Sequence, residues 1–314
     1  MAEVTGEALA GIRLLICMAK ADGVMRDEER HQLDDVLRGL TFPDGLTSET
    51  LLGETNNPAE LVKLVTSHEA RDSVYASVFA MAHADLEIAD AEDKLLTQLR
   101  TAWNIHPEEE KHLAKVLDAV HEATHDAPAP LHASVPEKER DAAFNKTLLR
   151  YALLTGVTGA IPVPLVPSLL VVPLQVKMVH AVAGIVGHKT DSDTIQLMFE
   201  TLGVGTGCQI AIIELCKLIP GLGSLIGAAG SFASTYALGK VAYIYFKSDG
   251  SRSIESLKPV YLEEKQRAKA EYAKHKDALA EAHEHHDDEI RKLAFDLQQG
   301  KITAREYEEK LDQL

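Results

Sequence analysis

Little in this sequence points to a disulfide framework or to a familiar enzyme. Its three cysteines, Cys17, Cys208 and Cys216, lie in apolar helical patterns, and no C-x-x-C pair occurs, so neither a disulfide scaffold nor a zinc ribbon is expected. The sequence also lacks a nucleophile-elbow serine, an H-E-x-x-H motif and a P-loop, each of which would mark an enzyme class. We therefore expect a protein that is not an enzyme, with a metal-dependent enzyme as the alternative.

Basic residues are scarce at the start of the chain. Residues 1–126 contain 25 Asp and Glu against 11 Lys and Arg, whereas residues 127–250 are close to neutral and residues 251–314 carry a net charge of −3. Nucleic acid needs a basic surface that displaces counterions, so it is not an expected partner. An acidic surface favours cations or basic proteins instead. The opening MAEVTGE lacks the basic segment of a secretory signal, which predicts a cytoplasmic protein.

The acidic part of the chain contains an internal repeat. Its two copies, MAKADGVMRDEE and MAHADLEIADAE, align at a constant offset of 63 residues. Apolar residues at helical spacing precede each copy, which predicts a helix ending near its first Asp. The second Asp of each copy, Asp27 or Asp90, is predicted to cap the next helix. Pro58 and Pro107 suit first-turn positions of further helices. These signals predict an all-α fold that begins with a pseudo-symmetric acidic bundle of about six helices.

Two of the repeated acids, Asp22 and Asp85, lie where a helix should end, and the helix dipole disfavours an anion there by about 0.3–1 kcal/mol. One explanation is an Asx turn, in which the carboxylate accepts N–H groups of its own loop. The other is a divalent cation, calcium or magnesium, which both prefer hard oxygen ligands, although no EF-hand pattern is present. His83, two residues before Asp85, is the histidine nearest to these acids in the sequence. The candidate metal ligands are Asp22, Asp27, Glu29, Asp85, Asp90 and Glu92.

The repeated motif, A-K-A-D-G-V-x-x-x-E-E and A-H-A-D-x-E-I-x-x-A-E, resembles the TerB tellurite-resistance family and the start of the DjlA co-chaperone. The resemblance covers residues 5–125 and implies an all-helical, pseudo-symmetric bundle with an acidic surface. It also implies a role in metal or oxidative stress, alongside membrane-linked or other tellurite-resistance-type partners. The second copy departs from the family because Leu86 replaces the usual Gly, and Leu disfavours a left-handed turn. The motif positions that carry over are Asp22, Glu29, Asp85 and Glu92.

After a linker at residues 127–140, two long segments carry no charge. They run from Tyr151 to Val176 and from Leu218 to Gly239, and by length either could span a bilayer. The prolines of IPVPLVP cannot lie inside a helix, so the first segment is predicted to form two helices, 141–160 and 167–187, joined by an apolar turn.

The second apolar segment has a small residue at every fourth position: Gly223, Gly227, Ser231, Thr235 and Gly239. These residues share one helix face and allow another helix backbone to approach closely, as in membrane helix pairs. The same row would also suit tight packing in a soluble core. Contact with lipid and a soluble core therefore both remain open for the apolar domain, residues 141–248.

The run VPLQVKMVHAVAGIVG, followed by LIPGLGSLIGAAGSFASTYALGKVAYIYF, resembles the hydrophobic domain of YcjF-type inner-membrane proteins. That domain is often fused to P-loop GTPases or encoded beside them. It implies a separate GTPase partner, and a location at the cytoplasmic face of the inner membrane, peripheral or partly inserted. The family's acid after the proline turn is absent here, where Pro167 and Ser168 stand nearby. The matching positions are Gln175, Met178, Gly187, Pro220, Gly221, Gly223, Gly239 and Phe246.

The end of the chain reads as a charged tail. Residues 249–289 predict a solvated helix, on which His283 and Asp287 have spacing that could chelate a transition metal. Residues 290–314 predict a helical hairpin, too small to fold alone, that packs on the body or on another copy. The run DLQQGKITAREYEEKLDQL resembles a short C-terminal domain of many bacterial proteins that is proposed to drive oligomerisation, which implies a homo-oligomer.

Taken together, these domains predict a bacterial, stress-associated binding protein. Its apolar domain is expected to dock on membrane lipid or insert partly into it. Its acidic bundle is expected to bind a cation or a partner protein. A soluble oligomeric scaffold without membrane contact is the alternative.

Overall fold

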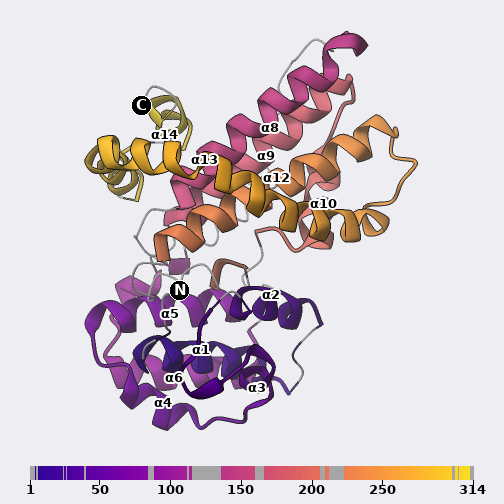
Figure 1. Cartoon of the computed structure of the whole chain (residues 1–314). Coiled ribbons are helices and arrows are strands. Elements are labelled where there is room, and N and C mark those ends of the chain that lie inside the picture. Colours follow the sequence, from indigo (N-terminus) through magenta and orange to yellow (C-terminus); the bar gives the residue numbers. More distant parts are fainter. Residues whose placement is uncertain are drawn as a thin grey trace. The chain divides into compact units, whose positions relative to one another are not determined.

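The computed structural model of this chain is helical throughout its regular described structure, which confirms the all-α prediction (Figure 1). It divides into two compact units, residues 1–118 with 205–226 and residues 119–204 with 227–314. The described residues are 4, 6–23, 25, 27–38, 40–83, 88–111, 113–114, 136–159, 166–205, 209–211, 223–298, 301–302 and 304–311.

Three helices of the first unit begin at a residue whose side chain caps them. Pro58 is the first helical residue of its helix, as predicted, and the Asn57 side chain accepts a hydrogen bond from the Ala59 N–H at 3.1 Å. Ser67 caps the next helix in the same way, and a further helical stretch begins at Pro107. The main helices are α1 (Gly6–Ala19), α2 (Asp27–Leu37), α3 (Ser48–Gly53), α4 (Pro58–Leu64), α5 (His68–Ala82) and α6 (Asp90–Trp103).

Helix α1 lies at the centre of the first unit and packs against α4 and α5, while α6 packs against the same two helices. Because α1 is apolar on nearly all sides, it is buried along most of its length, and Leu14, Leu15 and Ile16 are at most 1% exposed. Helix α2 packs against α3.

The sequence repeat reappears in the helix boundaries. Helix α1 ends at Ala19 and α5 at Ala82, while α2 begins at Asp27 and α6 at Asp90, so both pairs differ by 63 residues. The predicted capping role of the second Asp is wrong, since Asp27 and Asp90 are the first helical residues of α2 and α6. Ala89 is the cap position of α6, and its N–H donates to the Glu92 carboxylate at 2.8 Å.

The second unit contains the predicted helical hairpin. Helices α8 (Glu137–Gly159) and α9 (Val166–Val186) lie side by side (Figure 1) and agree with the predicted ranges, while the proline turn between them falls outside the described residues. Helix α10 (Ser192–Leu202) packs against α13 (Ile254–Gln298). The remaining helices are α12 (Gly223–Lys247) and α14 (Ala304–Leu311).

Helix α13 differs from the predicted tail. A charged helix ending at 289 and a separate hairpin from 290 were expected, but one helix of 45 residues runs through that boundary. The helix continues because the segment around this boundary is rich in Ala, Leu, Glu and Lys and contains no Gly, and these residues have high helix propensity. The side chains of the predicted His283 and Asp287 pair lie outside the described residues.

Candidate functional site

The six candidate metal ligands are placed only in part. Asp22, Asp27 and Asp90 are exposed, the first of them three residues beyond the end of α1. Glu92 holds the start of α6 through Ala89. Asp85 and the side chain of Glu29 lie outside the described residues, and no group of three His, Cys, Asp or Glu side chains within the described part could hold a metal ion. A cation at the complete set therefore stays a prediction.

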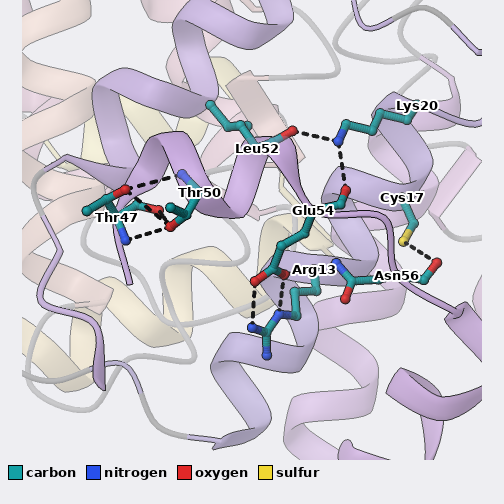
Figure 2. A network of polar contacts seen from close by, with 8 residues as sticks. All are labelled: Arg13, Cys17, Lys20, Thr47, Thr50, Leu52, Glu54 and Asn56. Carbon is teal, nitrogen blue, oxygen red and sulfur yellow. Dashed lines mark hydrogen bonds and ion pairs between the residues drawn. The ribbon is translucent and has the colours of Figure 1, made fainter. Parts of the chain in front are cut away.

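The lysine of the first repeat has a structural role (Figure 2). Lys20 follows the end of α1, and its Nζ donates hydrogen bonds to the Leu52 carbonyl at 2.5 Å and the Glu54 carbonyl at 2.9 Å. Both carbonyls lie at the C-terminal end of α3, where helix carbonyls lack intrahelical partners and the dipole favours a cation. Lys20 of the first repeat thus links the C-terminal end of α1 to that of α3.

A bidentate ion pair stands beside this lysine (Figure 2). Arg13 donates from Nε and Nη2 to the two Glu54 carboxylate oxygens, at 2.7 and 2.9 Å, and Asn56 donates to the same carboxylate at 3.0 Å. Hydrogen bonds from Arg13, with a smaller one from Asn56, hold the pKa of Glu54 below its usual value. The two side chains are only 22% and 25% exposed, so this pair fixes the loop after α3 more firmly than an exposed pair would.

Cys17 lies one helical turn from Arg13 on the same helix (Figure 2). Its Sγ is 3.9 Å from the Asn56 carbonyl oxygen. Burial raises the pKa of the thiol, and the opposing effect of nearby Lys20 is smaller. Because the thiolate is the reactive form, this cysteine is suited to packing rather than to nucleophilic chemistry.

In the second repeat, His83 stands where the first repeat has Lys20. It is the C-terminal cap of α5, its Nδ1 lies 2.8 Å from the Phe79 carbonyl oxygen, and its ring stacks on the Phe79 ring at 3.9 Å. Both copies therefore place a hydrogen-bond donor at the carbonyls of a helix end, which is a structural use of the motif. The sequence pattern singled out the acids of the motif but not this shared role.

The Glu7 side chain links the start of α1 to the start of α5 within the first unit. Its carboxylate accepts hydrogen bonds from the backbone N–H groups of Thr66 and Ser67, at 2.6 and 2.7 Å, and from both of their hydroxyls. These hydrogen bonds, led by the Thr66 hydroxyl, lower the pKa of Glu7 from 4.5 to about 2. The carboxylate thus sits at the N-terminal end of α5, where the helix dipole favours an anion.

In the second unit, the predicted row of small residues brings two helix backbones together. A Cβ on Gly159 of α8 would lie 2.5 Å from the Gly227 carbonyl oxygen and 2.8 Å from Ser231 Cβ on α12. Further along, a Cβ on Gly239 would clash with Leu148 and lie 3.0 Å from Met178 Sδ. The prediction that this row admits a close neighbour is confirmed, and we call the α8–α12 contact the glycine seam.

A line of buried polar side chains crosses the same unit. Thr155 donates to the Thr235 hydroxyl at 2.9 Å, and Gln175 of α9 donates to the same hydroxyl at 3.0 Å. Ser234, the next residue on α12, lies 3.0 Å from the Tyr261 hydroxyl of α13. All five side chains are at most 2% exposed, so their hydrogen bonds offset the cost of removing these groups from water. We call them the polar line.

Within the described ranges, none of the helices combines the length and the apolar character that crossing a membrane requires. Comparisons of the chain with protein-family models, curated proteins and solved structures find no match. The resemblances to TerB and YcjF-type proteins therefore stay predictions.

Proposed function

We propose that this chain is a non-enzymatic binding protein whose acidic first unit holds a cationic partner. One observation carries the proposal: three basic side chains of this unit bind groups within it, and three of the repeated carboxylates are exposed. Arg13 and Lys20 are engaged by the loop after α3, and Arg100 forms a two-contact pair with Glu110. Asp22, Asp27 and Asp90 are exposed, so the net negative field reaches solvent.

Such a field attracts a basic protein surface and accelerates its association. The repeated acids lie at helix ends, where loop backbone is accessible to a partner. We prefer a basic protein over a single divalent ion, since the placed carboxylates of the predicted ligand set do not form a group of three.

The test measures binding of a short polylysine peptide to the full chain by isothermal titration calorimetry at two salt concentrations, with calcium and magnesium titrated separately. The test variant carries Asp22→Asn, Asp27→Asn and Asp90→Asn. The control carries Glu49→Gln, Glu69→Gln and Glu109→Gln, three exposed acids of the same unit, so the change in net charge is equal.

We expect the peptide to bind the parent in a salt-sensitive way, and the Asp variant to bind it more weakly than the Glu variant. Equal weakening in both variants would mean that net charge alone, rather than the repeated loop ends, attracts the peptide. Failure of the parent to bind the peptide at low salt would overturn the proposal. Tight calcium or magnesium binding that the Asp variant loses would replace the basic protein with a metal ion.

A second candidate function is docking on a membrane through the apolar domain. It is favoured by the two charge-free segments, Tyr151–Val176 and Leu218–Gly239. Liposome flotation of the full chain tests it: salt-resistant flotation would support insertion. A chain that stays at the bottom of the gradient would instead assign the glycine seam and the polar line to a protein interior.

A further inference from the structure

Among the described side chains of the last helix, one is buried against the rest of the second unit. In α14, Tyr307 is 1% exposed, while Glu306, Glu309 and Lys310 face solvent. The Tyr307 hydroxyl lies beside Thr158, near the C-terminal end of α8. Among the described side chains of this short helix, Tyr307 is thus the buried anchor.

This anchor is imperfect. The Tyr307 hydroxyl has no hydrogen-bond partner among the described residues, and the neighbouring Thr158 hydroxyl already donates to the Leu154 carbonyl at 2.8 Å. Burial raises the pKa of Tyr307, and the adjacent Thr158 hydroxyl, whose geometry does not make it a hydrogen-bond partner, opposes this rise with a smaller effect. A buried hydroxyl without a partner opposes the burial of the ring that carries it, so water would satisfy this hydroxyl only when α14 lifts away.

We propose that α14 is a releasable strap over the end of α8. Burial of the tyrosine ring stabilises the closed position of α14. The unsatisfied hydroxyl lowers the stability of that position, so α14 opens more often than it would without this group. The covered position, Thr158, adjoins Gly159 of the glycine seam, where the backbones of α8 and α12 approach closely. Opening the strap therefore exposes the end of this seam.

The test makes the covered position reactive. Thr158→Cys places a thiol beneath Tyr307 with little change in volume, and a maleimide pulse followed by peptide mass spectrometry reads its labelling apart from the three native cysteines. When opening precedes labelling, the rate reports the population of the open state. Tyr307→Phe and Tyr307→Ala are each added to this variant. Tyr272→Phe, at another buried tyrosine of the same unit (7% exposed), is the matched control.

We expect Tyr307→Phe to slow labelling by about fivefold or more, because the ring stays buried without the unsatisfied hydroxyl. Tyr307→Ala should accelerate labelling, and Tyr272→Phe should leave it unchanged. Labelling as fast in Tyr307→Phe as in the parent would overturn the proposal, as would protection that persists in Tyr307→Ala. Labelling that slows as protein concentration rises would show that a second copy, rather than the same chain, supplies the cover.

Hydrogen exchange of α14 with Thr158 intact gives a second readout. Its amides should exchange more slowly in Tyr307→Phe than in the parent, while those of α10 stay unchanged. Equal exchange of α14 in the two proteins would also refute the strap.

Discussion

One methyl group at Gly227 should destabilise the second unit, whereas the same group at Gly230 should not. Both glycines lie in α12, three residues apart. A Cβ at Gly227 would overlap the carbonyl oxygen of Gly159 and lie 3.2 Å from its carbonyl carbon, but a Cβ at Gly230 would meet no atom within 4 Å. The obstacle at Gly227 is backbone, which cannot rotate away as a flexible side chain can.

The magnitude follows from two opposing effects. Replacing Gly by Ala within a helix raises the free energy of unfolding by about 1 kcal/mol at either position. At Gly230 this gain stands alone. At Gly227 the overpacked contact between α8 and α12 costs about 1–3 kcal/mol, so we expect Gly227→Ala to be less stable than Gly230→Ala by that amount.

Urea unfolding followed by far-UV circular dichroism measures this difference. The single tryptophan, Trp103, belongs to the first unit, so its fluorescence follows that unit separately in the same samples, as a chain of two units requires. Equal unfolding midpoints for Gly227→Ala and Gly230→Ala would refute the close backbone contact and the glycine seam with it.

Three further predictions concern named hydrogen bonds. Because the folded pKa of Glu7 is depressed from 4.5 to about 2, its contribution to stability is present above pH 4.5 and is lost as the pH falls toward 2. The free energy of unfolding of the first unit, measured by urea unfolding with Trp103 fluorescence, should therefore fall between about pH 5 and pH 3. This fall should be steeper in the parent than in Glu7→Gln. Arg13→Ala leaves a partly buried carboxylate without its bidentate partner and should lower the unfolding free energy of the first unit by about 1–3 kcal/mol, whereas Lys63→Ala, in an exposed pair, should change it by less than about 1 kcal/mol. Thr235→Val keeps the volume of the polar line but removes its shared hydroxyl, and should cost the second unit about 1–3 kcal/mol by circular dichroism; a loss below about 0.5 kcal/mol would mean that the line is not a stabilising network.

The sequence predicted the features that depend on local rules. Three prolines within seven residues disfavour a continuous helix, so the hairpin of α8 and α9 followed from IPVPLVP, although single prolines, Pro173 and Pro259, lie inside α9 and α13. Small residues four apart must share a helix face, so the row through Gly227 and Gly239 predicted a close neighbour. In both cases the signal lies within one segment of chain, and no knowledge of the rest of the fold was needed.

Features that depend on distant partners could not be predicted in this way. Arg13 and Glu54 are 41 residues apart, and no short sequence pattern predicts that they form an ion pair. The acids of the repeat were visible, but the sequence could not distinguish Glu92, which holds a helix start, from exposed neighbours such as Asp90. The role of each acid depends on which side chains the packing of the fold brings close to it, and the composition of the chain does not predict those neighbours.

The polar line explains how such apolar helices acquire a defined arrangement. A helix that is apolar on all sides gains nearly the same burial at any rotation about its axis, so burial alone leaves α9 and α12 without a preferred register. Gln175 and Thr235 remove that freedom, because rotating either helix would leave a buried polar group without its hydrogen bond. The backbone contact at Gly159 acts in the same direction, since only glycine at the crossing allows it. We infer that the glycine seam sets how closely these helices pack and that the polar line sets which faces they turn to each other.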